Sequence, residues 1–188
     1  MIKREIRVLG IDDAPFKKEV DKKVLVVGIV YRGGNYLDGV ISDYVTVDGD
    51  DATDKLIALI KRTKHRGQLQ MIMLKGLAVG GFNVIDIHKL WHKTKLPVLV
   101  VMKRLPRWGE FFSAMINAPN CREKAILVEK AGDITRANHL YIQSAGLTKK
   151  QAFEVLKICC THGKIPEPLR VAHIIASGIV EGESRGRA

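Results

Sequence analysis

The chain has 188 residues, 46% of them apolar, which is enough for one full-sized hydrophobic core and too few for two. We therefore expect a single domain, 1–188. Lysine and arginine number 31 against 20 acidic residues, for a net charge of +11. This excess favours polyanionic partners, above all nucleic acid, because a positive field attracts phosphate groups. The alternative is a basic surface with no dedicated partner.

The cysteines and the N-terminus favour a cytoplasmic protein. Cys121, Cys159 and Cys160 are odd in number and lack the spacing of a disulfide framework, which indicates a reducing compartment. The N-terminus leads directly into a strand-like run and lacks the pattern of a signal peptide. No apolar run approaches the length that spans a bilayer. We therefore expect neither secretion nor membrane insertion.

The first part of the chain predicts three antiparallel strands. An apolar run at 4–11 is followed by a second at 23–31, which is apolar on both faces and so predicted to be buried. Residues 33–35 read as a hairpin turn, and 36–47 alternates with the period of a strand.

The middle of the chain predicts alternating helices and parallel strands. A helix is expected at 51–65, a strand at 69–74, a helix at 83–94 and a strand at 97–102. The later elements are less regular: a short helix at 111–117, a helical or irregular stretch to 129, a strand at 139–143, and helices at 148–161 and 169–177.

This order predicts an α/β fold of the ribonuclease H-like kind, with a mixed five-stranded central sheet flanked by helices. Three antiparallel strands come first, then two parallel crossover strands. In this arrangement the first strand lies beside the fourth, about 4.8 Å away. Residues at the carboxyl ends of these two strands are then expected to face one site.

Acidic side chains near these strand ends are candidate ligands of a divalent ion. Asp12 and Asp13 close the first strand, and because successive strand residues point to opposite faces, only one of them can enter a given site. Asp48, between the third strand and the first helix, is a candidate second carboxylate. The alternatives are turn formation for the first pair and helix capping for Asp48.

Lysines complicate this prediction. Lys75 ends the strand that neighbours the first one, and its ammonium would pair with Asp12 and compete with Mg²⁺. Together with Lys103 it could instead hold a backbone phosphate, unless both are solvated surface residues. The glycine-containing segment 75–83 lies between a predicted strand and a predicted helix, where backbone amides could hold an anion.

The chain resembles endonuclease V over nearly its whole length, in several separate motifs. They are the runs at 8–12, 97–103, 141–146 and 163–173. A little-characterised archaeal family related to endonuclease V, the endonuclease dU family, is more similar still. It shares Gly-Ile-Asp-Asp, Val-Asp-Gly-Asp-Asp-Ala-Thr and Gly-Gly-Phe-Asn-Val-Ile-Asp with this chain.

The resemblance implies a Mg²⁺-dependent endonuclease, with Mn²⁺ as a substitute, that cuts DNA near deaminated bases as part of DNA repair. It implies a site at the ends of the central strands. Asp12 matches the first metal-binding aspartate, Asp48 a second acidic metal ligand, and Lys103 a functional lysine, so these three are the expected catalytic residues.

The chain departs from endonuclease V at two positions. Lys75 stands where that family has an aspartate, and 146–147 stands where a late histidine motif would fall. Three interpretations therefore remain: a metal-dependent endonuclease acting on uracil- or hypoxanthine-containing DNA, a nucleic-acid-binding protein that has lost catalysis, and a protein-interaction module. DNA is favoured over RNA, and the predicted nucleic-acid-binding residues are Lys75, Gly76, Lys103, Arg104 and Arg170.

Overall fold

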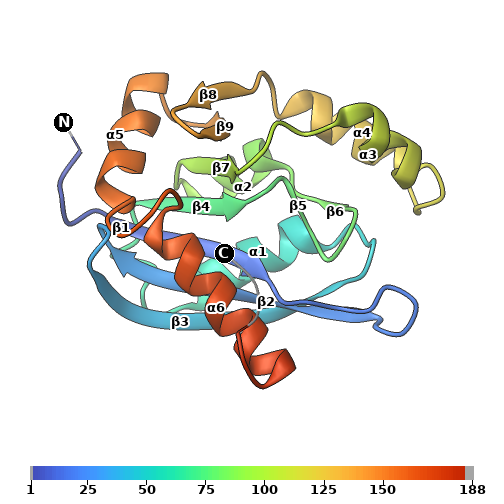
Figure 1. The fold of residues 1–188 in the computed structure, drawn as a ribbon, viewed down its shortest axis with the longest axis horizontal. Helices are drawn as coiled ribbons and strands as arrows, with labels where there is room; N and C mark the ends of the chain where they lie inside the picture. The colour runs from blue at the N-terminus through green and yellow to red at the C-terminus, as the bar shows by residue number, and fades with distance from the viewer. Residues whose placement is uncertain (1, 185–188) are drawn as a thin grey trace.

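A twisted mixed sheet forms the centre of the computed structural model, which describes residues 2–184 (Figure 1). Its seven strands have the order β3-β2-β1-β4-β7-β9-β8. The strands are β1 (Arg7–Asp13), β2 (Lys23–Arg32), β3 (Tyr36–Thr46), β4 (Met71–Lys75), β7 (Val98–Met102), β8 (Thr135–Ala137) and β9 (Leu140–Ala145). The helices are α1 (Ala52–Arg62), α2 (Ile87–Thr94), α3 (Trp108–Met115), α4 (Cys121–Lys130), α5 (Lys149–Cys159) and α6 (Glu167–Glu181).

The strand pairing confirms the predicted ribonuclease H-like arrangement. β1 pairs antiparallel with β2 and parallel with β4, so the first strand is central. β4 then pairs parallel with β7. The predicted number of five strands was too low, because β9 pairs antiparallel with the outer side of β7 and forms a hairpin with the three-residue β8.

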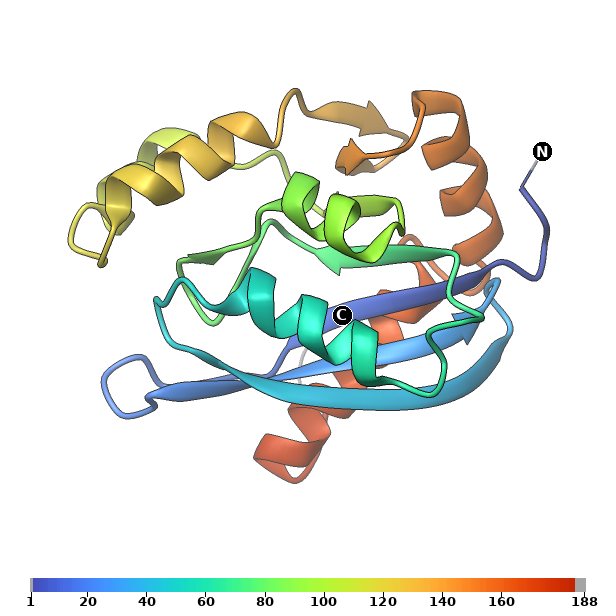
Figure 2. The same cartoon turned by 180° about the vertical axis from the view of Figure 1, so that it is seen from behind.

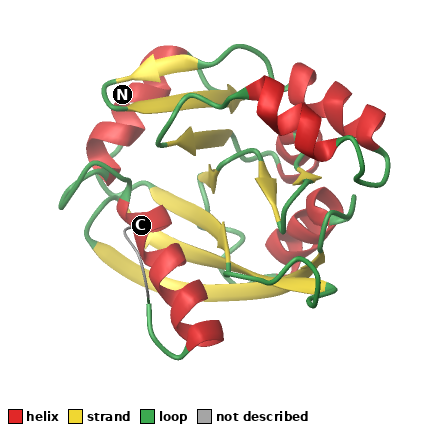
Figure 3. Cartoon of the chain, turned by 45° about the vertical axis from the view of Figure 1, so that its right-hand side comes forward, coloured by secondary structure: helices red, strands yellow, loops and turns green. Residues whose placement is uncertain are grey.

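Helices cover both faces of the sheet, as strands apolar on both faces require (Figures 2 and 3). On one face α1 and α2 pack on side chains such as Ile72 and Leu74. On the other face, Met71 and Met73 of the same strand pack in the cluster that includes the buried side of α5. Alternation along β4 therefore decides which layer each residue joins. No helix in the described range has both the length and the apolar character needed to cross a membrane.

The helix predicted at 83–94 begins later, at Ile87, because a small hairpin precedes it. Its strands are β5 (Ala78–Val79) and β6 (Asn83–Val84). Gly80 and Gly81 form the turn with φ of 56° and 86°, a backbone conformation in which glycine avoids the steric cost of a side chain. Asp86 then caps α2 by accepting a hydrogen bond from the Lys89 amide.

The last helix packs directly on the central strands. A Cβ added to Gly10 would lie 2.5 Å from the carbonyl carbon and Cβ of Pro168, so only a glycine in β1 allows α6 to approach this closely. Ala172 and Ala176 of α6 are fully buried against β2. This close packing brings the middle of α6 beside the carboxyl end of β1.

Candidate functional site

A buried ion pair joins the carboxyl ends of the two central strands. Asp12 of β1 is 3% exposed, and its Oδ2 accepts a hydrogen bond from Nζ of Lys75 of β4 at 2.7 Å. The two strands are parallel neighbours, with Ile11 paired to Leu74. The sequence prediction that these two side chains meet is therefore confirmed.

His173 of α6 completes the site, and the sequence analysis did not identify it. Its Nδ1 lies 2.9 Å from Nζ of Lys75 and 3.0 Å from Oδ2 of Asp12. The sequence feature that could have identified His173 is its position directly after Ala172, at the border of the face of α6 that carries small residues. That signal has meaning only once α6 is known to cross β1. We call Asp12, Lys75 and His173 the central triad.

One ring nitrogen of His173 faces both other members of the central triad. The Lys75 ammonium has three protons and can donate both to Asp12 and to His173. Nδ1 of His173 accepts a hydrogen bond from Lys75 in the tautomer that carries the ring proton on Nε2, and donates to Asp12 in the tautomer that carries it on Nδ1. The triad thus combines one carboxylate, one ammonium and one imidazole within hydrogen-bonding distance.

Asp13, the next residue, enters a different environment. Its Oδ2 accepts a hydrogen bond from the Gly80 amide at 2.8 Å. Burial, and to a smaller degree the charge of Asp12, raises the pKa of Asp13 to about 6. The expectation that only one of the two aspartates enters the site agrees with this arrangement. The amides expected to hold an external anion instead bind the protein's own carboxylate.

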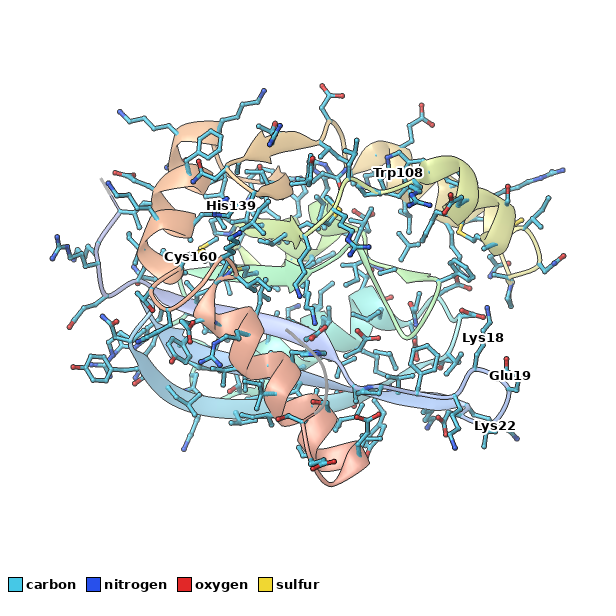
Figure 4. The ribbon with its side chains drawn as sticks, viewed as in Figure 1. Lys18, Glu19, Lys22, Trp108, His139 and Cys160 are labelled. Carbon is cyan, nitrogen blue, oxygen red and sulfur yellow. The ribbon has the colours of Figure 1, made fainter. Side chains whose placement is uncertain are left out.

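Asp48 also faces the β5–β6 hairpin. Its Oδ1 accepts a hydrogen bond from the Phe82 amide at 2.9 Å, and its Oδ2 lies 2.8 Å from Nζ of Lys18. Lys18 lies in the loop between β1 and β2 (Figure 4). The Asp48 backbone is left-handed, with φ of 51°, and its carbonyl accepts a hydrogen bond from Lys124. Among the described residues, no hydrogen bond or ion pair joins Asp48 to Asp12.

The central triad does not fit a divalent metal ion. Mg²⁺ favours oxygen ligands in octahedral geometry, whereas the site offers one carboxylate, one imidazole and a competing ammonium. Within residues 2–184, no three His, Cys, Asp or Glu side chains form a group suited to a metal ion. Lys75 supplies the positive charge that an ion would bring. The shared Asp12–Asp48 site therefore stays a prediction.

Lys103 and Gly76 lie next to the central triad. Together with Lys75 they line a cavity of about 250 Å³. Partial burial and then the charges of Lys75 and Arg104 lower the pKa of Lys103, which shows that several cations share this edge of the sheet. Arg104 itself is exposed in the loop that follows β7. The predicted phosphate-binding residues Lys75, Gly76 and Lys103 are thus neighbours.

Arg170 lies beside this group but is engaged by a carboxylate. Its guanidinium makes a two-pronged ion pair with Glu167, with the shortest contact 2.7 Å. Glu167 is only 1% exposed and stands in the first turn of α6. The pairing raises the pKa of Arg170 and neutralises Glu167, so no bare carboxylate opposes an approaching phosphate here.

Sequence relatives cover the whole chain. The model of the endonuclease dU family matches residues 4–180. A UPF0215 protein from Methanothermobacter thermautotrophicus is 48% identical over 100% of this chain and 94% of its own length. A UPF0215 protein from Archaeoglobus fulgidus is 47% identical over 97% of this chain and 98% of its own.

Solved structures show the same fold. A crystal structure of an Archaeoglobus fulgidus protein superposes with a TM-score of 0.87 at 45% identity, covering 93% of this chain and 98% of that one. Endonuclease V from Ciona intestinalis, crystallised with DNA containing an inosine, superposes with a TM-score of 0.62 at 14% identity, covering 94% and 87%. The second likeness concerns the fold alone.

Proposed function

Because the chain belongs to the endonuclease dU family, we propose that it binds DNA containing deaminated bases and receives a backbone phosphate at the central triad. The chain is related to endonuclease V by family and by fold. One observation carries the proposal. Asp12 is buried and paired with Lys75, and Lys75 and Lys103 both line a cavity beside it.

The chemistry of the central triad suits a phosphate group. Besides Lys75, which pairs with Asp12, Lys103 brings a second ammonium to this edge of the sheet. A phosphate oxygen can accept a hydrogen bond from Nε2–H of His173 and an ionic contact from an ammonium. Lys75 links the other two members of the triad, with Nζ 2.7 Å from Oδ2 of Asp12 and 2.9 Å from Nδ1 of His173.

Binding of short DNA duplexes by fluorescence anisotropy tests this proposal. The duplexes carry uracil, hypoxanthine or only ordinary bases, and we expect tighter binding to the deaminated ones. Lys75→Met should weaken binding by about tenfold because the variant has no ammonium to bind the phosphate, and affinity should fall as salt rises. Lys61→Met, an exposed charge on α1 across the sheet, is the matched control. An affinity that changes neither with salt concentration nor in Lys75→Met would exclude nucleic acid as the partner.

A second candidate function is Mg²⁺-dependent cleavage of the same DNA, with Asp12, Asp48 and Lys103 as the acting residues. The family match over residues 4–180 and the fold likeness to endonuclease V support it, although the central triad as it stands does not suit a metal ion.

A nicking assay decides between binding alone and cleavage. Wild type and Asp12→Asn are incubated with deaminated duplexes in Mg²⁺, Mn²⁺ or a chelator. Cleavage that requires both the metal and Asp12 would establish the nuclease. Tight binding without any cleavage would support a protein that binds this DNA and does not cut it. Nicking that survives Asp12→Asn would point to a contaminating nuclease.

A further inference from the structure

A line of three adjoining cavities leads away from the central triad. The first, beside Lys75, has a volume of about 250 Å³ and shares Lys103 and Leu140 with a second of about 720 Å³. The second shares Leu140 and Lys164 with a third of about 690 Å³. They run between the β8–β9 hairpin and the loop that joins α5 to α6, where His139 and Cys160 lie (Figure 4). We call this line the basic groove.

The walls of the basic groove carry one sign of charge. The residues that line its outer two cavities include Lys103, Arg136, His139, Lys157, His162 and Lys164. All the lining residues of the three cavities lie in the described part of the chain, and none is Asp or Glu. The buried Glu167 stands near the second cavity, and Arg170, which lines that cavity, pairs with it. A groove with cationic walls of this kind concentrates polyanions.

The floor of the basic groove is apolar, and one aromatic ring is accessible there. Leu140 and Ile165 lie along the first two cavities. Phe153 of α5 lines the third cavity and is 40% exposed, next to Lys157 and Arg136. An exposed aromatic ring among cations is the arrangement on which single-stranded nucleic acid stacks its bases while its phosphates contact the cations.

We propose that the basic groove binds a single-stranded nucleic-acid segment adjoining the nucleotide held at the central triad, with a base stacked on Phe153 and phosphates contacting Lys157 and Lys164. This inference rests on the proposed function, because the strand enters the groove from the triad. It assigns the β8–β9 hairpin, which extends the sheet beyond β7, to substrate binding.

Variants on both sides of the groove test the proposal with deaminated duplexes that do or do not carry a single-stranded extension at either end. Phe153→Ala should weaken binding of one extended form by about tenfold, the loss of one stacked base, without changing its salt dependence. Lys157→Gln with Lys164→Gln should lower the slope of log affinity against log salt by about 0.7 for each phosphate that the variant no longer neutralises.

Controls match each change. Phe112→Ala removes a ring of α3 that is 37% exposed and lies outside the three cavities. Lys149→Gln with Lys150→Gln removes two exposed charges from the first turn of α5. Both controls should bind like wild type.

The outcomes separate the groove from the proposed function. One result would overturn the proposed role of the groove and leave that of the triad: the wild type binds deaminated duplexes more tightly than Lys75→Met does, yet gains no affinity from either single-stranded extension. Equal losses of affinity in the groove variants and in their controls would show that the changes do not act at the groove. This result would also overturn the proposed role of the groove. Wild type that binds no nucleic acid would overturn both.

Discussion

Asp12 and Asp13 are neighbours in one strand but belong to chemically different regions. Asp12 faces α6, where an ammonium and an imidazole contact its carboxylate within 3.0 Å. Asp13 faces the β5–β6 hairpin, where it accepts a hydrogen bond from a neutral amide and burial raises its pKa to about 6. The two faces of a single strand thus hold one carboxylate paired with an ammonium and one whose pKa burial raises to about 6.

The contrast shows that a carboxylate acquires its role from its partners. On the α6 face the positive charges come from side chains, so a phosphate can approach after Asp12 has been neutralised. On the hairpin face, the carboxylates of Asp13 and Asp48 accept hydrogen bonds from backbone amides and hold the loop itself. The following changes would break or sharpen this difference.

The largest expected effect comes from removing the ammonium on the α6 face. Lys75→Met leaves Asp12 buried without its cation, and we expect the free energy of unfolding to fall by about 3 kcal/mol. Adding Asp12→Asn should recover most of this loss, because the buried charge is removed as well. Urea unfolding of the four proteins in this cycle measures the coupling. Strictly additive losses would contradict the pairing.

A smaller, pH-dependent effect is expected on the hairpin face. The pKa of Asp13 is raised above its ordinary value, so the folded state binds the proton more tightly than the unfolded state, and stability falls as pH rises from about 4 to about 6. Asp13→Asn keeps the acceptor for the Gly80 amide and avoids this penalty.

We expect the variant to be about 2 kcal/mol more stable than wild type at pH 7 and equal to it near pH 4, since each pKa unit corresponds to about 1.4 kcal/mol and partial exposure reduces the total. Thermal or urea unfolding across this pH window checks the sign. A difference that is constant with pH would show that Asp13 does not titrate in this range.

Exchanging the cation for a carboxylate should turn the α6 face into a metal site. Lys75→Asp would place a second carboxylate beside Asp12 and His173, a donor set that suits Mn²⁺. At ten times its dissociation constant, Mn²⁺ should stabilise this variant by about 1.4 kcal/mol, seen as a rise in melting temperature. Wild type should gain much less. An equal gain in wild type would favour the metal-dependent nuclease instead.

The smallest effect is expected at the surface of the hairpin face. Lys18 pairs with Asp48 at 2.8 Å, but the Lys18 side chain is 51% exposed. Lys18→Met should therefore change the free energy of unfolding by less than about 1 kcal/mol, measured by urea unfolding beside Lys75→Met. A loss as large as that of Lys75→Met would mean that Asp48 depends on its cation as Asp12 does.

Much of the fold could be predicted from local patterns. The doubly apolar run of β2, the alternation of β3 and the strand–helix order of the middle segment are periodicities that need no distant partner, and they indicated the five central strands. The start of α2 was placed too early because Asn83 and Val84 pair with β5. That pairing depends on the turn that Gly80 and Gly81 form.

The candidate site was predictable only where strand ends define it. The sequence alone determined that Asp12 and Lys75 end adjacent parallel strands, because topology follows from the order of elements. Only the tertiary structure decided that His173 joins them, that Asp48 turns to the hairpin, and that the β8–β9 hairpin and the α5–α6 loop border one groove. The physical reason is that these contacts arise from the packing of segments distant in the chain, such as the close approach of α6 to Gly10, and no local periodicity records them.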